Sequence, residues 1–106
     1  MPRWTTSSKE MEKISEISGA LLVQRGPIFL VTLENGEKHE GIMTGFYVGT
    51  NQPNPIFRFH GHIILNSLMN SLYIDMLDIR HVISISTPAK LKEYEDLGLL
   101  RSADYT

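Results

Sequence analysis

Two adjacent residues near the end of a strand-rich region have the chemistry to contact nucleic acid. Arg80 carries a planar guanidinium that can hold a phosphate with two hydrogen bonds or stack on a base, and His81 can do either more weakly. The alternative is a solvated turn in which Arg80 pairs with Asp78. Single-stranded sites usually interleave more aromatic and basic residues than this stretch contains. The pair is still the chain's best candidate for RNA contact.

Tyr47, together with Asn51 or Asn54, is a candidate base pocket. Tyrosine offers a ring on which a base can stack, and asparagine can read base edges. The alternative is that Tyr47 is an ordinary strand aromatic and that the asparagines cap a turn.

His60 and His62 lie two residues apart, so an extended chain places both imidazoles on the same side. With His39 or His81 they could form a metal site. No carboxylate or thiol lies beside them at ligand spacing, and histidines near a strand bend are usually structural. We therefore expect no metal here.

Asp75 and Asp78 are the nearest approach to a catalytic carboxylate pair. Acid–base catalysis needs a pocket whose environment separates two pKa values, whereas a three-residue separation near a turn fits a solvated loop or a cap. The chain has no cysteine, and its serines lack an elbow motif. The sequence predicts neither an enzyme nor a bound cofactor.

Composition sets further limits. The 106 residues predict one domain over 1–106, with 10 Lys and Arg, 12 Asp and Glu, and a net charge of −2. This charge argues against a protein that coats nucleic acid by bulk electrostatics. The absence of cysteine and of a long apolar run leads us to expect a soluble, cytoplasmic protein with no membrane partner.

A helix is predicted over 8–18. Ser7 and Glu10 have the spacing of a capping box, in which each side chain satisfies the other's free backbone N–H. Apolar residues then recur at helical spacing, and Gly19 can serve as a left-handed stop. The stripe is narrow, which suits a helix that lies across one mouth of a barrel.

After residue 27 the apolar period changes to two, which predicts a strand over 29–33. Asn35-Gly36 then predicts a tight hairpin in which both turn residues have positive φ. The return strand is predicted over 37–48. Two glycines within it, four residues apart, predict a sharp bend. They are Gly41 and Gly45.

The rest of the chain predicts three further strands and a short helix. The expected order is a loop over 49–55, a strand over 56–60, a segment over 62–65 that continues this strand or starts another, and a turn over 66–71. Two short strands or one bent strand within 72–86 and a helix over 88–97 follow. The turn within 72–86 is expected at 77–78 or at 80–81. The predicted fold is thus mostly β: a small, strongly bent, five-stranded antiparallel barrel over 28–86 with an N-terminal helix and a short C-terminal helix.

One stretch of this region resembles the first motif of the Sm-like proteins (Sm, Lsm and Hfq). It reads Val31-x-Leu33-x-x-Gly36-x-x-x-x-Gly41-x-Met43. In that family an alternating strand ends at a glycine turn, and a second glycine lets the next strand bend. The resemblance implies an Sm-like, SH3-like barrel that works as a binding module in RNA metabolism.

A second, shorter match supports the same family. Ile79-Arg80-His81 resembles both the Ile-Arg-Gly of Sm proteins and the Tyr-Lys-His of Hfq. The family usually has an acidic residue where this chain has Tyr47. Its asparagine then follows in a tight loop, whereas here the loop is long and contains proline. The resemblance implies that RNA would bind at Tyr47, Asn51 or Asn54, Arg80 and His81.

The resemblance also implies a homo-oligomeric ring of five to seven subunits. An open small barrel leaves two strand edges unpaired, and pairing one edge with the opposite edge of a neighbour closes a ring. The candidate interface residues are Leu72, Tyr73, Ile74, Val82, Ile83 and Ile85. The alternative is a monomer whose edge is covered by the C-terminal helix.

Two functions follow as hypotheses. The first is an Sm-like ring that binds single-stranded RNA. The second is a ring of the same architecture without RNA binding, which acts as a structural or protein-interaction scaffold. An unrelated SH3-like adaptor, by contrast, would be a monomer that binds a peptide.

Overall fold

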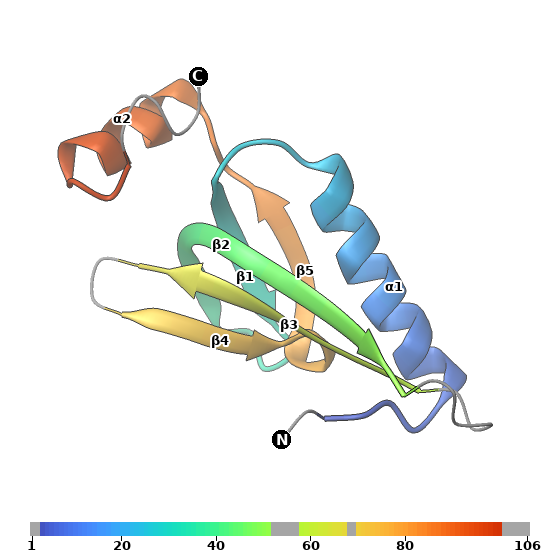
Figure 1. Ribbon diagram of the computed structural model, residues 1–106. Coiled ribbons are helices and arrows are strands. Elements are labelled where there is room, and N and C mark those ends of the chain that lie inside the picture. The colour runs from blue at the N-terminus through green and yellow to red at the C-terminus, as the bar shows by residue number, and fades with distance from the viewer. Residues whose placement is uncertain (1–2, 52–57, 68–69, 101–106) are drawn as a thin grey trace.

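The computed structural model describes residues 3–51, 58–67 and 70–100, and this part contains two α-helices and five strands (Figure 1). In chain order the elements are α1 (Ser8–Val23), β1 (Ile28–Leu33), β2 (Lys38–Thr50), β3 (Phe59–Asn66), β4 (Ser71–Asp75), a one-turn 3-10 helix η1 (Met76–Asp78), β5 (Ile79–Ser84) and α2 (Pro88–Asp96). The predicted order of helix, five antiparallel strands and short helix is confirmed.

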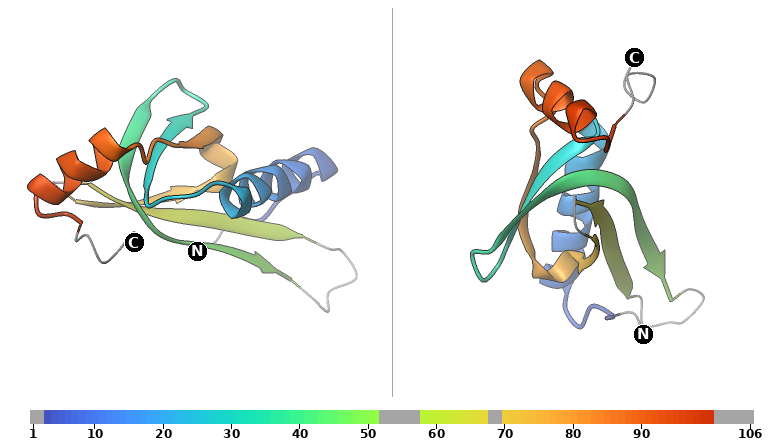
Figure 2. Two further views of the ribbon diagram at one scale, coloured as in Figure 1. Left: turned by 90° about the horizontal axis from the view of Figure 1, so that it is seen from above. Right: turned by 90° about the vertical axis from the view of Figure 1, so that its left-hand side faces the viewer.

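All five strands belong to one antiparallel sheet with the order β4-β3-β2-β1-β5. The long strand β2 pairs with β1 through its first half and with β3 through its second half. β2 is therefore the strand that joins the two halves of the sheet, and it curves strongly between them (Figure 2).

The bend in β2 lies where the glycines predicted it. The register with β3 shifts between Met43 and Gly45, as a bulge requires. A side chain at Gly41 would collide with the backbone carbonyl of Asn66 on β3, whereas a side chain at Gly45 would meet open space. Gly41 thus allows the close approach of two backbones.

The β1–β2 turn differs in detail from the expected hairpin. Gly36 has a φ of 91°, but no residue other than glycine has positive φ in the described part of the chain. Asn35 instead uses its side-chain oxygen to accept a hydrogen bond from the N–H of Glu37 at 2.9 Å. This local bond satisfies the turn without the left-handed conformation that was expected of Asn35.

Helix α1 begins as predicted, with half of the capping box in place. The N–H of Glu10 donates to the Ser7 hydroxyl at 3.2 Å. The Glu10 carboxylate, however, accepts from the N–H and the hydroxyl of Thr6, at 2.6 and 2.8 Å, rather than from the N–H of Ser7. The second arm of the box therefore reaches one residue further back than predicted.

The predicted end of α1 at residue 18 is wrong, because the helix continues through Gly19 to Val23. A glycine inside a helix costs about 1 kcal/mol, and burying a leucine side chain can offset that cost. Leu21 lies beyond Gly19 and is buried in the core with Ile14 and Ile17. Burial of the extra turn thus outweighs the local stop signal.

Within the described residues the sheet is not closed into a barrel, so the predicted barrel over 28–86 is found as an open, bent antiparallel sheet. β4 and β5 are its two edge strands, and η1 joins them. α1 lies along one side of the sheet (Figure 1) and packs its buried face against β3, β5 and η1.

The turn within 72–86 is η1, which agrees with the first of the two predicted positions. Asp75 caps it, because its carboxylate accepts from the N–H of Leu77 at 2.9 Å. Asp78 pairs with Arg3 at 2.8 Å. The two carboxylates therefore have separate structural roles.

A second, smaller apolar cluster holds α2 against the start of the sheet. Its buried members are Ile28, Tyr94 and Leu100. The Tyr94 hydroxyl donates to Glu40 at 2.8 Å, and burial together with this carboxylate raises the pKa of Tyr94. Lys90 also donates to Glu40, at 3.0 and 3.1 Å, and this bond raises the pKa of Lys90. These contacts anchor α2 to β2, which is an inner strand of the sheet and not an edge strand.

Candidate functional site

Five aromatic and imidazole rings form a continuous row, which we call the ring row. Its members are Trp4, His60, Tyr47, His62 and Tyr73. The centroids of Tyr47 and His60 lie 5.6 Å apart, those of Tyr47 and His62 lie 5.7 Å apart, and those of His62 and Tyr73 lie 4.1 Å apart with nearly parallel planes. Trp4 meets His60 edge-on at 4.6 Å. The row therefore crosses β2, β3 and β4.

The alternation of β3 places the two histidines in this row. Gly61 and Ile63 are buried, so His60 and His62 point to the opposite side of the sheet from the core. In the register with β2, His62 faces Tyr47 and His60 faces Gly49. A side chain at Gly49 would collide with the His60 ring, so this glycine gives His60 its space.

The two tyrosines of the row are accessible. Tyr47 is 54% exposed and Tyr73 is 67% exposed. His62, between them, has a buried Nδ1 with no hydrogen-bond partner in the described part of the protein. The row thus offers two open ring surfaces on either side of an imidazole. Flat, accessible rings of this kind can stack on nucleobases.

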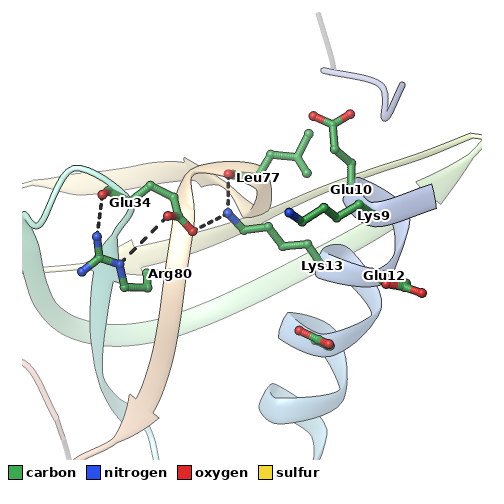
Figure 3. Close-up of a pocket in the computed structure, with 8 residues that line it drawn as sticks. Lys9, Glu10, Glu12, Lys13, Glu34, Leu77 and Arg80 are labelled. Carbon is green, nitrogen blue, oxygen red and sulfur yellow. Dashed lines mark hydrogen bonds and ion pairs between the residues drawn. The ribbon is translucent and has the colours of Figure 1, made fainter. Parts of the chain in front are cut away.

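The structure places Arg80 elsewhere, in a charge cluster with Lys13 and Glu34 (Figure 3). Arg80 donates to the backbone carbonyl of Glu34 at 2.8 Å, and its Nε lies 4.0 Å from the Glu34 carboxylate. The alternative prediction that Arg80 pairs with Asp78 is therefore wrong. Asp78 forms an ion pair with Arg3, and the β1–β2 turn places Glu34 beside Arg80.

Glu34 is held on both sides in this cluster. Lys13 of α1 donates to its carboxylate at 2.7 Å and to the Leu77 carbonyl at 2.8 Å. The hydrogen bond from Lys13 is the main reason that the pKa of Glu34 is lowered, and the charges of Lys13 and Arg80 act in the same direction. The adjoining pocket of about 410 Å³ is lined by both signs of charge, so it shows no preference for an anion.

The remaining predicted contact residues are spread over the fold. His81 is exposed on β5 and lines an apolar groove with Ala20 and Val23. The Asn51 side chain accepts from the N–H of Arg58 at 2.7 Å, so its amide oxygen is already engaged by the backbone of this chain. Asn54 lies outside the described residues.

Tyr47 and Arg80 thus have different partners within one chain. Tyr47 contacts the β3 histidines, whereas Arg80 contacts Glu34 beside the β1–β2 turn. His60 and His62 were considered as metal ligands, but they lie beside the two tyrosines. Among the described residues, no three His, Asp or Glu side chains are grouped so that they could hold a metal ion.

The sequence singled out three residues of the ring row as candidates for a base or metal site but did not indicate that Trp4 joins them. The two-residue spacing of His60 and His62 predicts a shared face, and Tyr47 was singled out separately. Trp4 lies before the first helix, and only tertiary pairing of Thr5 with Phe59 brings it to β3: the N–H of Thr5 donates to the Phe59 carbonyl at 2.8 Å. No local sequence signal reveals that pairing.

The candidate interface residues lie on or beside the two sheet edges. Leu72, Tyr73 and Ile74 belong to β4, whereas Val82 and Ile83 belong to β5 and Ile85 follows it. The side chains of Ile74 and Val82 are buried in the protein's own core. These two residues can therefore offer a partner only their backbone groups.

Neither helix in the described ranges combines the length and the apolar character that a membrane crossing requires. No protein-family model matches the chain, and comparisons with curated proteins and with solved structures find no significant similarity. Any proposal about function must therefore rest on the site and on the strand edges.

Proposed function

We propose that this chain is an Sm-like, ring-forming module that binds single-stranded RNA. The observation that carries the proposal is the ring row, where rings from β2, β3 and β4 lie side by side and the tyrosines of β2 and β4 are accessible. Successive bases of a single strand can stack on such rings whatever their identity, since every base has a π-face. Aromatic and imidazole rings on an open sheet face are typical of single-strand recognition.

The ring assembly is supported by the two unpaired edges of the sheet. β4 and β5 each end the sheet on one side, and the two edges are chemically different surfaces. Pairing β4 of one copy with β5 of the next would be a heterologous contact, and repetition of such a contact can close into a ring. The early helix, the bent β2 and the glycine-containing motif support the Sm-like family.

Assembly would also give Arg80 and His81 a place in RNA binding. Within one copy, Arg80 is held by Glu34 and lies apart from the contacts of Tyr47. In an oligomeric ring, every subunit carries both the aromatic stacking surface and the basic residues Arg80 and His81. One RNA strand can then contact these two surfaces in turn. Arg80 would then contribute charge, and the ring row would contribute stacking.

The second candidate is a ring that does not bind RNA and works as a scaffold. The specific observation in its favour is that Glu34 offsets the charge of Arg80, in a chain whose net charge is −2. Under this alternative the ring row would stabilise the sheet, because cross-strand aromatic pairs do so on their own.

Binding of fluorescent oligo-U and oligo-A measured by anisotropy separates the two candidates. We expect Tyr47→Ala to weaken binding about tenfold or more, because stacking of one base on an aromatic ring contributes about 1–3 kcal/mol. Phe46→Ala is the matched control, since Phe46 is the next residue of β2 and lines a groove with Leu21 and Gln24. No binding by the wild type would remove the RNA proposal, whereas equal loss in both variants would show that the ring row is not the binding site.

The salt dependence of the same measurement tests the role of Arg80. Each phosphate contact that is lost makes the slope of log affinity against log salt shallower by about one. We expect Arg80→Ala to reduce the slope and Tyr47→Ala to leave it unchanged. The oligomeric ring is tested by measuring the molar mass of the protein in solution by light scattering. A monomer at every concentration would contradict the ring.

A further inference from the structure

The side chain of Gln24 lies against the outer edge of β5. Its Nε2 donates to the carbonyl of Val82 at 3.0 Å, and its Oε1 accepts from the N–H of Ser84 at 2.6 Å. The same Nε2 is 3.1 Å from the carbonyl of Ala20, in the last turn of α1. One side-chain amide thus links the end of the helix to an edge strand.

The backbone register shows that these groups belong to the free edge. The N–H of Ile85 donates to the carbonyl of Ile28 at 2.9 Å, so this residue points its backbone groups toward β1. Alternate residues of an antiparallel strand point their backbone groups to opposite sides. The groups of Val82 and Ser84 therefore point away from β1, toward the side where a sixth strand would pair.

Gln24 uses these groups in the way that a neighbouring strand would. An added strand supplies peptide N–H and C=O groups to the edge, and a glutamine amide carries the same donor and acceptor on one planar unit. While Gln24 makes both hydrogen bonds, the N–H of Ser84 is not free to donate to an incoming strand. The carbonyl of Val82 already accepts a hydrogen bond from Gln24. The Ser84 hydroxyl also donates to the Arg25 carbonyl, which holds the linker after α1 at this edge.

The surface around Gln24 is apolar and exposed. A groove of about 510 Å³ is lined by residues of α1 and β5, among them Val23, His81 and Ile83. Val23 is 79% exposed and Ile83 is 50% exposed. A second copy whose β4 edge paired here would bring Tyr73, a large exposed side chain of that strand, into reach of an apolar surface.

We propose that Gln24 competes with the β4 strand of a second copy for the edge of β5, and so sets the concentration at which the protein assembles. This inference rests on the proposed ring. Assembly requires the Gln24 amide to leave Val82 and Ser84, which costs two hydrogen bonds before the intermolecular ones form. Gln24, at the end of α1, thereby protects the edge of β5 from strand addition.

The test compares the self-association of wild type and Gln24→Ala by analytical ultracentrifugation over a range of concentrations. Alanine keeps the helix end but cannot bond to the edge, so we expect assembly at a concentration about tenfold lower, the effect of roughly one net hydrogen bond. Ser18→Ala is the matched control, because the Ser18 hydroxyl donates to the carbonyl of Ser15 within α1 and not to the sheet edge. Circular dichroism checks that each variant is folded.

A double variant locates the contact. Ile83→Lys places a charge on the edge strand, which opposes strand addition. In the Gln24→Ala background it should reverse the gain in assembly. If the double variant assembles as readily as Gln24→Ala, the competition is at another surface and the inference is wrong.

The outcomes also separate this inference from the ring proposal. Equal assembly of wild type and Gln24→Ala would overturn the competition and leave the ring intact. Monomers in both proteins at all concentrations would overturn both. Assembly by Gln24→Ala alone would support the competition and show that the wild-type edge is closed.

Discussion

Gly41 lies with the backbone carbonyl of Asn66 directly beside its Cα, so any side chain there would press on the backbone of β3. Backbone cannot move aside as the end of a flexible side chain can. Gly45 lies four residues along the same strand, and a side chain there would meet nothing within 4 Å. The two glycines look equivalent in the sequence, but they meet different surroundings.

We therefore expect Gly41→Ala to lower the free energy of unfolding by about 1–3 kcal/mol, the usual range for overpacking in a well-packed interior. Gly45→Ala should change it little or raise it by up to about 1 kcal/mol, because alanine restricts the unfolded chain. Urea unfolding of the two variants measures the difference. A similar loss in both would mean that general strand flexibility, and not the close approach to Asn66, is what the glycines provide.

The start of α1 depends on the ionised carboxylate of Glu10. The N–H of Thr6 and then its hydroxyl lower the pKa of Glu10 below its ordinary value of 4.5. A carboxyl group whose folded pKa is lowered stabilises the fold above its unfolded pKa and loses that contribution as the pH falls through its folded pKa. The helix cap is thus sensitive to acid.

Glu10→Gln should destabilise the protein at neutral pH, because an amide oxygen is a weaker acceptor than a carboxylate. The difference from wild type should shrink in strongly acidic solution, where Glu10 is also neutral. Thermal unfolding at both pH values checks this, with Glu12→Gln as a control on the same helix. A difference that does not change with pH would show that the carboxylate charge is not what stabilises the cap.

Local signals predicted the elements well where the contacts are also local. Ser7 marked the start of α1, Thr87 and Pro88 marked the start of α2, and the two-residue period marked β1. The end of α1 could not be predicted in this way, because Leu21 is held by residues of the distant sheet. The partners of Arg80 and Gln24 could not be predicted for the same reason, because each side chain bonds to a residue far away in the sequence.

In the whole molecule, α1 supplies much of what stabilises the open sheet. Ile14, fully buried, lies in one cluster with residues of β1, β3, β4 and β5. We expect Ile14→Ala to lower the free energy of unfolding by about 2–5 kcal/mol, as for other buried isoleucines. Leu22→Ala, on the same helix but 74% exposed, should change it by less than about 0.5 kcal/mol.

Chemical denaturation of the two variants tests whether the helix is part of the core. Equal small effects would mean that the sheet is stable without α1. Retention of the native near-ultraviolet spectrum in Ile14→Ala would show that the loss is one of stability and not of structure. The order of helices and strands was predicted, but the open sheet of the described residues was not. A strand pattern predicts that a strand forms but not which strands pair, so it does not show whether a sheet closes.

The strand order has a consequence for how the protein is made. β1 and β2 pair as soon as the turn at Gly36 is formed, but the other side of β1 is completed only by β5, whose partners for Phe29 and Val31 are Ser84 and Val82. In a chain growing on the ribosome, one edge of β1 therefore stays unpaired while β3, β4 and β5 are synthesised, and this edge is exposed to wrong pairing with other chains. The last strand to emerge is the one that ends this exposure.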